Sequence, residues 1–279
     1  MKRGLTAAVL LVAAASSAFA TPLIWRGAGM LKPLGFQAYV GTGYLQTAKK
    51  WVDSTESWVE LGDASKTTTI KVFPAVMFAP VKNLEVGLHA PLFLKTKDTL
   101  SSMGLGDAWF KARYGILQGK LTPVKLTFTA AAVFPTAAED ANPSLGDRTL
   151  NFGFGLIGQT QSLAGFVGHL RLGYWLNGKK KAGEVEKAQG NMLEYVAKVD
   201  YNFTKKFQLW LSGVGTMQAE AEGNAETNRH MLSLGAVWKP LPVVKLNVRP
   251  KVLVPLEALS KGGSINPWEA GLDFWVDLP

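Results

Sequence analysis

The segment LEVGLHAPLFLKTK (Leu84–Lys97) alternates apolar residues with other residues through most of its length. Its second register contains the ionisable residues Glu85, His89 and Lys95. A period of two is the period of an extended strand, and this segment is longer than the roughly five or six residues of a usual strand. Its apolar side must therefore face either the core of a soluble protein or the lipid of a membrane.

Further segments alternate in the same way, and together they make about twelve expected strands. They lie near residues 36–44, 70–78, 108–116, 124–134, 150–156, 166–176, 193–203, 207–211, 229–239, 244–254 and 268–278. The register of the segment near 229–239 is ambiguous. Short and long connections alternate strictly along the chain. The short ones are 80–83, 118–123, 160–162, 204–206 and 239–242, and the long ones are 48–66, 95–104, 135–147, 177–191, 218–229 and 257–266.

This pattern predicts an all-β protein, a transmembrane antiparallel up-and-down β-barrel of about twelve strands. Short turns at one end, long loops at the other, an even strand count and both termini at the short-turn end are typical of outer-membrane barrels. A soluble sandwich gives no reason for this strict alternation. A closed barrel pairs every backbone group, which allows a sheet to lie in lipid. We therefore expect Glu85, His89 and Lys95 to face the lumen, and the apolar side of Leu84–Lys97 to face lipid.

The N-terminus has a positively charged start, a short apolar run and an A-x-A motif at 18–20. Residues 1–20 are therefore expected to be a cleaved secretory signal peptide, and 21–279 the outer-membrane barrel domain. An uncleaved membrane anchor is the alternative. The chain has no Cys, so disulfides do not stabilise it. Removal of Lys2 and Arg3 lowers the formal charge from +9 to +7, and export of this basic chain argues against nucleic acid as its partner.

Aromatic residues occur near the expected strand ends on the apolar side, where they suit girdles at the lipid–water interfaces. They are Tyr44, Phe78, Phe134, Tyr174, Phe203, Phe207, Trp238 and Trp268. Aromatic residues are also common in any strand, so ordinary strand composition is the simpler interpretation of these positions. The girdle interpretation makes outer-membrane lipid a partner of the chain.

The tripeptide Leu-Gly-Asp recurs where three loops lead into the next strand. The copies are Leu61–Asp63, Leu105–Asp107 and Leu145–Asp147. Gly-Asp suits a tight bend, so repeated turn chemistry is one interpretation. A cation site at the rim, made by Asp63, Asp107 and Asp147, is the alternative. The sequence has no other pattern that resembles a metal cluster, a cofactor site or a phosphate loop.

The polar register of the strands is rich in cations. They are Lys71, Lys111, Arg113, Lys125, Arg171, Lys198, Lys245, Arg249 and Lys251. The acids of that register are Glu85, Asp107, Glu194, Asp200, Glu269, Asp273 and Asp277. Because the strands of Lys111 and Arg249 are not neighbours, their cations are expected to face each other across the lumen and to concentrate anions there. Pairing between lumen charges, such as Arg171 with Glu194 or Asp200, is the alternative.

Four Trp residues share the lumen register, namely Trp109, Trp175, Trp210 and Trp275. They could stack on a ring-shaped solute, or they could simply fill the interior. Together with the basic residues they predict a passive diffusion channel for small anionic or aromatic solutes.

An outer-membrane lipase or protease is the rival hypothesis, because some barrels of this size are enzymes. The chain has only three His residues, His89, His169 and His230. Ser233 follows His230 by three positions, which places the two side chains on opposite faces of a strand. The sequence therefore predicts no catalytic residues. A closed structural or adhesive barrel is a third alternative.

Several segments resemble the family called MetA-pathway of phenol degradation, which comprises outer-membrane transporter barrels. They are Gly104–Gly115 (GLGDAWFKARYG), Phe134–Thr136, Ser144–Asp147, Phe152–Leu156 and His169–Tyr174. The resemblance is best over 100–176 and implies passive uptake of small, often hydrophobic compounds. It carries over no site residues. The chain departs from the pattern at Ala137, where the family has Gly, and at Pro279, where such barrels usually end on an aromatic residue read by the barrel-assembly machinery.

Overall fold

A computed structural model describes residues 27–119, 122–182, 185–221, 226–240 and 246–278. The expected signal peptide and Lys245 lie outside these residues. Within the described part, no helix is both long and apolar enough to cross a membrane.

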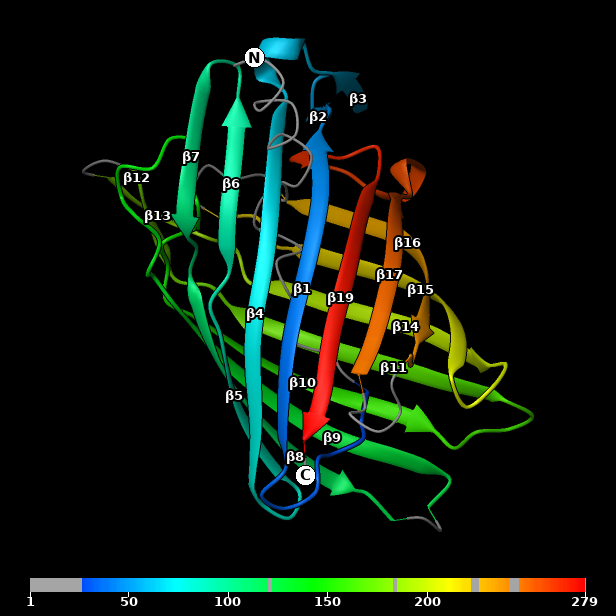
Figure 1. The fold of residues 1–279 in the computed structure, drawn as a ribbon. Coiled ribbons are helices and arrows are strands. Elements are labelled where there is room, and N and C mark those ends of the chain that lie inside the picture. The colour runs from blue at the N-terminus through cyan, green and yellow to red at the C-terminus, as the bar shows by residue number, and fades with distance from the viewer. Residues whose placement is uncertain (1–26, 120–121, 183–184, 222–225, 241–245, 279) are drawn as a thin grey trace, which may run out of the picture.

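The described chain folds into one closed antiparallel sheet (Figure 1). Its strands are β1 (Phe36–Thr47), β4 (Thr67–Val81), β5 (Leu84–His89), β6 (Leu92–Lys97), β7 (Leu100–Leu105), β8 (Ala108–Leu117), β9 (Val124–Phe134), β10 (Asn151–Thr160), β11 (Phe166–Leu176), β14 (Met192–Asn202), β15 (Phe207–Gln218), β16 (Thr227–Trp238), β17 (Leu246–Pro255) and β19 (Glu269–Leu278). Strand β1 pairs with β19 on one side and with β4 on the other, which closes the barrel. The sequence prediction of twelve strands is confirmed, because β5–β6 and β7–β8 are each one interrupted strand.

The interruption of the quoted segment lies at Ala90 and Pro91. Pro91 has no backbone N–H to donate, so a continuous ladder cannot pass through it. The backbone bridges the break in another way: Ala90 N donates to Pro74 O at 3.2 Å, and Gly106 N donates to Pro91 O at 2.7 Å. Both halves, β5 and β6, still pair with β4.

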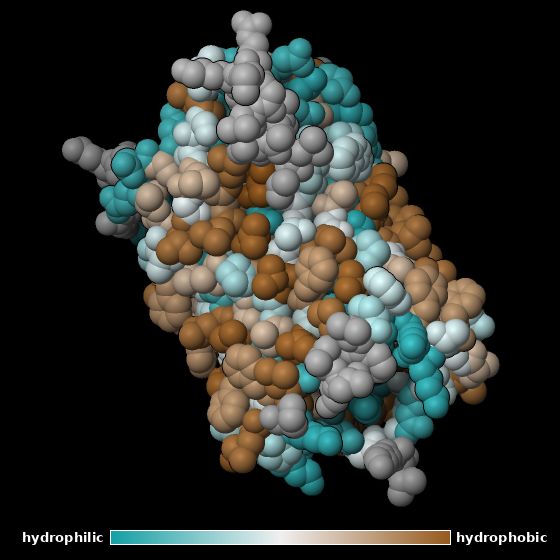
Figure 2. All heavy atoms as spheres, in the orientation of Figure 1, coloured by the Kyte–Doolittle hydropathy of each residue, from teal (hydrophilic) through white to brown (hydrophobic). Residues whose placement is uncertain are grey.

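The two registers of the strands face opposite environments, as the alternation predicts. In the quoted segment Leu88 is 57% exposed, whereas Glu85 and His89 are buried inside the barrel. Figure 2 shows hydrophobic residues spread over the visible wall and hydrophilic residues gathered toward both ends of the barrel. The wall is therefore apolar outside and polar inside, which is the arrangement of a membrane barrel.

The predicted aromatic residues lie on the outer face near both ends of the wall. Phe78, Phe203, Phe207 and Trp238 are exposed at the short-turn end, and Phe134, Tyr174 and Trp268 are exposed at the long-loop end. The ring of Tyr44 lies 5.3 Å from the ring of Trp268.

The long loops contain structure that the sequence did not predict. They include β2 (Lys49–Val52), β3 (Ser57–Glu60), η2 (Asp63–Ser65), β12 (Lys179–Ala182), β13 (Val185–Ala188), η3 (Glu257–Leu259) and β18 (Ser264–Ile265). A small sheet in the order β18-β2-β3 joins two loops that are far apart in sequence. Lys49 Nζ reinforces it by contacting Glu257 Oε1 at 2.9 Å.

A charge on the lipid-facing side of the wall is expected to destabilise the barrel. Leu172 lies in the middle of β11 and is 47% exposed on the outer face. We expect Leu172→Arg to lower the free energy of unfolding in lipid vesicles by about 2–4 kcal/mol, measured by urea titration of Trp fluorescence. Leu163→Arg, in the short turn before β11, is the matched control with an expected loss of about 0–1 kcal/mol. Equal losses would contradict the lipid-facing assignment.

Candidate functional site: the barrel lumen

The lumen is narrow, and its large side chains lie flat against glycines of neighbouring strands. A Cβ added to Gly235 of β16 would lie 2.5 Å from Trp210 Cζ2 of β15, and one added to Gly271 of β19 would lie 2.7 Å from Lys251 Cε of β17. The missing Cβ atoms leave room for these side chains. The glycines therefore keep part of the lumen open although bulky residues face it.

Residues 27–31, which we call the lumen segment, fold back inside the barrel. Ala28 is fully buried among Val133, Ile157 and Trp175. Its N–H donates to Gln159 Oε1 at 3.0 Å. Its carbonyl accepts hydrogen bonds from Thr127 Oγ1 at 2.7 Å and from Gln118 Nε2 at 2.9 Å. The wall of β8, β9 and β10 therefore holds this segment through hydrogen bonds.

A buried ion pair fastens the same segment to the wall. Arg113 Nη1 of β8 contacts Glu85 Oε2 of β5 at 2.5 Å, and both side chains are buried. Arg113 Nη2 also donates to Gly27 O, and Glu85 Oε1 accepts the N–H of Leu31, each at 2.5 Å. A buried charge needs a partner and hydrogen bonds, and the segment supplies the hydrogen bonds here. Arg113 thus holds the lumen segment in place.

The predicted residues Lys111, Trp109 and Trp175 lie on the same side of the lumen. The rings of Trp109 and Trp175 pack edge to face with centroids 5.2 Å apart. Trp175 Nε1 donates to Glu194 Oε2 at 3.2 Å, and Lys111 Nζ lies 5.0 Å from the centre of the Trp109 ring. Both Trp side chains pack in the cluster that contains Ala28 of the lumen segment.

The other side of the lumen is hollow. A cavity of about 330 Å³, the turn-side cavity, lies toward the short-turn end, and its lining includes Gln37, His169, Gln208, Trp275 and Asp277. Gly27, Gly29 and Met30 of the lumen segment form part of its wall. A second cavity of about 130 Å³, the loop-side cavity, lies toward the long-loop end, and its lining includes Phe73, Val196, Trp210 and Leu253.

The two cavities share four lining residues, Tyr39, Arg171, Lys198 and Arg249, which we call the waist. Three of them were predicted from the sequence as solute-path candidates. Tyr39 was missed, although it stands in the inward register of β1 between Gln37 and the glycines Gly41 and Gly43. That register was the available signal for its position.

The charged side chains at and beside the waist differ in how much of their surface is exposed. Asp273 contacts Arg249 at 2.7 Å and Lys251 at 3.1 Å, and Asp200 contacts Lys198 at 2.6 Å. The side chains of Asp273 and Asp200 are 0% and 5% exposed, whereas those of Lys251, Arg249 and Lys198 are 21%, 19% and 12% exposed. Both carboxylates are less exposed than the cations that they contact, although Asp200 also lines the turn-side cavity. Neither Asp200 nor Asp273 lines the loop-side cavity, so a solute there meets the cations of these pairs.

The pairing alternative for the lumen charges is realised extensively. Besides the waist pairs, Lys71 contacts Glu269 at 2.7 Å. Of the two acids considered as partners of Arg171, Asp200 contacts Lys198 and His169, and Glu194 accepts a hydrogen bond from Trp175. Lys125 stands in the inward register near the short-turn end of β9 and lines neither cavity.

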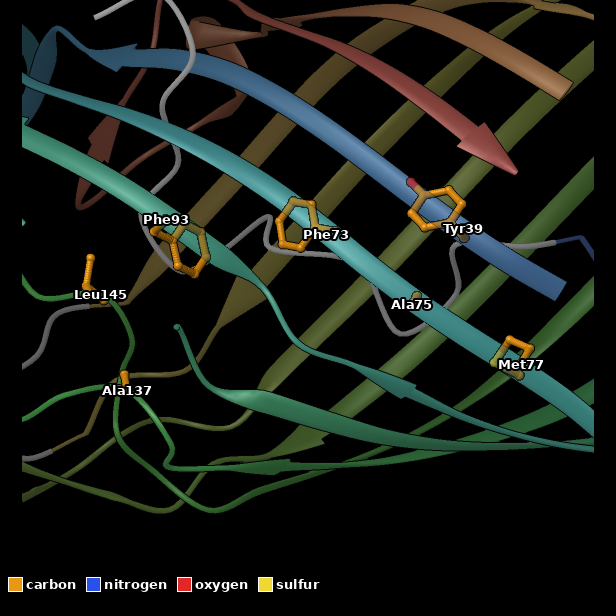
Figure 3. Packing of buried hydrophobic residues seen from close by; sticks show 7 residues of the cluster. All are labelled: Tyr39, Phe73, Ala75, Met77, Phe93, Ala137 and Leu145. Carbon is orange, nitrogen blue, oxygen red and sulfur yellow. The ribbon is translucent and has the colours of Figure 1, made fainter. Parts of the chain in front are cut away.

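The loop at 135–150 packs against buried residues of the barrel wall at the long-loop end. Figure 3 shows Leu145 and Ala137 of this loop in one cluster with Phe93 and Phe73 of the wall. Asp107 anchors the loop, because its carboxylate accepts the N–H of Ala137 at 3.2 Å and of Arg148 at 2.9 Å. In this copy of Leu-Gly-Asp, the aspartate therefore holds a loop that lies 30 to 41 residues further along the chain.

The rim cation site is not formed by these aspartates. Asp63 is 97% exposed and contacts Lys66 at 2.8 Å, while Asp107 is buried and engaged with backbone N–H groups. Among the described residues, no group of His, Asp and Glu could hold a metal ion.

The histidines occupy different environments. His89 is buried in the lumen register, and His169 Nε2 contacts Asp200 Oδ2 at 2.6 Å beside the turn-side cavity. His230 Nδ1 contacts the hydroxyl of Tyr195 at 2.6 Å. An attacking nucleophile needs a base within hydrogen-bond reach, and the contacts of His169 and His230 are to a carboxylate and a phenol.

Comparisons with known proteins agree with this architecture. A family model described as "Putative MetA-pathway of phenol degradation" matches residues 34–255. The outer membrane channel from Pseudomonas putida F1 is similar in fold, with 12% identity, a TM-score of 0.77 and coverage of 89% of this chain and 97% of that one. The β domain of a Bordetella autotransporter is 11% identical, with a TM-score of 0.51 and coverage of 87% and 98%. No match was found among curated proteins.

The hydrogen bonds that hold the lumen segment can be tested with one introduced cysteine, because the chain has no cysteine of its own. Gly29 lines the turn-side cavity and has open space for a side chain. In a Gly29→Cys background, Thr127→Val with Gln118→Leu removes two donors to the Ala28 carbonyl. At about 1 kcal/mol each, we expect labelling by a water-soluble maleimide to be roughly thirtyfold faster. Thr129→Val, another buried inward Thr of β9, is the control and should not change the rate.

The role of Asp107 gives a second test of the lumen architecture. Asp107→Ala removes hydrogen bonds to a charged acceptor, each of about 1.5–3 kcal/mol, so the loop should open more often. We expect trypsin to cleave after Arg148 at least roughly tenfold faster in liposome-embedded protein. Asp63→Ala, the exposed aspartate of the same tripeptide, should leave this rate unchanged. Similar acceleration by both variants would show that Asp107 is no anchor.

Proposed function

The chain belongs to the MetA-pathway of phenol degradation family, and we propose that it is an outer-membrane channel through which small solutes diffuse passively. The observation that carries the proposal is the pair of cavities that meet at the waist inside a closed, apolar-walled barrel. A lumen filled only by packed side chains would serve a structural barrel. The hollow half of this lumen favours transport instead.

The lumen segment supports this proposal by restricting the passage to one side. It packs against β8–β10, and the cavities are lined mostly by β1, β11, β14, β15, β17 and β19. A solute path along that side contacts the waist, which would select among solutes by charge. We infer that the cationic waist gives the channel a mild preference for anions.

We also propose that residues 1–20 direct export and are cleaved, and that the barrel-assembly machinery inserts residues 21–279 into the outer membrane. The short turns would then face the periplasm and the long loops the exterior, as in other barrels of this class. We assign no catalytic role, because the side chains of His169 and His230 contact Asp200 and Tyr195, and neither contact is the Ser–His pair of a lipase or serine protease.

Planar-bilayer recording of the purified, folded protein tests the channel proposal. In a KCl gradient we expect discrete conductance steps and a reversal potential on the side of chloride selectivity. Salt should weaken the preference, because the Debye length falls from about 10 Å at 0.1 M to about 3 Å at 1 M. Folding is checked in each preparation by the different gel mobility of boiled and unboiled protein.

Two outcomes would contradict the proposal. Folded protein that gives neither conductance nor swelling of liposomes in a small sugar is not a passive channel. A preference for potassium would leave the channel in place but would reject the selectivity assigned to the waist.

A further inference from the structure

We propose that the waist and the loop-side cavity together form a binding site for a small aromatic carboxylate, an inference that rests on the channel function proposed above. The site has two chemically different parts. Cations form its floor at the waist, and rings and aliphatic side chains form its walls. Such a division fits a solute with one anionic end and one flat apolar end.

The charges on the cavity lining favour an anion. Among the residues that the structure describes, the cations of this lining are Lys71, Arg171, Lys198, Arg249 and Lys251, and its carboxylate is Glu269. Lys71 contacts Glu269 directly, and the other carboxylates, Asp200 and Asp273, contact Lys198, Arg249 and Lys251 but do not line this cavity. A bound carboxylate would therefore add acceptors to cations that already contact one carboxylate.

Trp210 provides the second, independent observation. Its side chain is more than nine-tenths buried, it lines the loop-side cavity, and its Nε1–H has no hydrogen-bond partner among the described residues. A buried indole N–H normally has an acceptor. Lys198 Nζ lies 5.3 Å from the centre of the Trp210 ring. The Lys198 ammonium and the Trp210 indole thus lie together on the lining of this cavity.

The remaining walls favour a ring as the apolar part. Phe73, Tyr39 and Trp210 present aromatic surface, and Val196, Val214 and Leu253 present aliphatic surface. The volume of about 130 Å³ is small, so the site suits a single ring rather than a long chain. Stacking on an aromatic side chain contributes about 0.5–1.5 kcal/mol beyond burial.

Benzoate is the probe, with phenol and acetate as matched controls that carry only the ring or only the carboxylate. The measurement is the concentration that halves the chloride current in planar bilayers in 1 M KCl, where long-range charge effects are screened. We expect benzoate to act at a concentration about tenfold lower than phenol and about fivefold lower than acetate.

Three variants locate the site. Lys251→Met removes a cation of the loop-side cavity while Asp273 keeps Arg249 as partner, so we expect an about tenfold weaker effect of benzoate. Trp210→Phe keeps a ring but removes the N–H and should weaken it several-fold. Lys125→Met removes the same charge from the lumen register but lines neither cavity, and should leave benzoate unchanged. Lys198→Met replaces Lys251→Met if gel mobility shows that the latter does not fold.

The outcomes separate the two proposals. If the wild type conducts chloride but benzoate acts no better than both phenol and acetate, the binding site is wrong and the channel stands. If Lys125→Met weakens benzoate as much as Lys251→Met, the effect belongs to the net charge of the lumen, and the site is again wrong. If folded protein carries no current and passes no sugar, the channel proposal itself fails.

Discussion

The structure depends on the need to pair every backbone N–H and C=O that lies in hydrocarbon. The chain meets this need by closing its sheet, with β1 hydrogen-bonded to both β19 and β4. Closure sends every second side chain into the barrel. Because twelve strands enclose a narrow space, the inward charges cannot all reach bulk water, and they need partners inside the wall.

The chain provides those partners in two different ways on the two sides of the lumen. On one side, Arg113 and Glu85 pair with each other and complete their hydrogen bonds on the backbone of the lumen segment, so charge and chain fill that space together. On the other side, Asp200 and Asp273 pair with the waist cations Lys198 and Arg249, and the space beside these pairs is open. The same requirement thus yields a packed half and a hollow half.

The sequence predicts much of the fold, because period-two alternation reports directly which side chains face lipid. The strand count, the outward face of Leu84–Lys97 and the girdle positions follow from it. The site is less predictable, since a register says only that a residue faces inward. Trp175 and Trp210 share that register, yet one packs on Ala28 and the other lines a cavity. The lumen segment, residues 27–31, has no period-two alternation, so nothing in the sequence placed it inside the barrel.

Counting charges in the polar register likewise could not distinguish a basic passage from an interior neutralised by ion pairs, because the structure contains both. The position of each charged side chain relative to the cavities distinguishes the basic passage from the neutralised interior. In the loop-side cavity, the carboxylate of the lining is Glu269, which pairs with Lys71, while Asp200 and Asp273 do not line the cavity. A cation there would have to compete with a buried partner for a carboxylate, whereas an anion meets the cations of the lining directly. Selectivity therefore follows from which charges line the cavity, and a nearly balanced count of acids and bases is compatible with a preference for one sign.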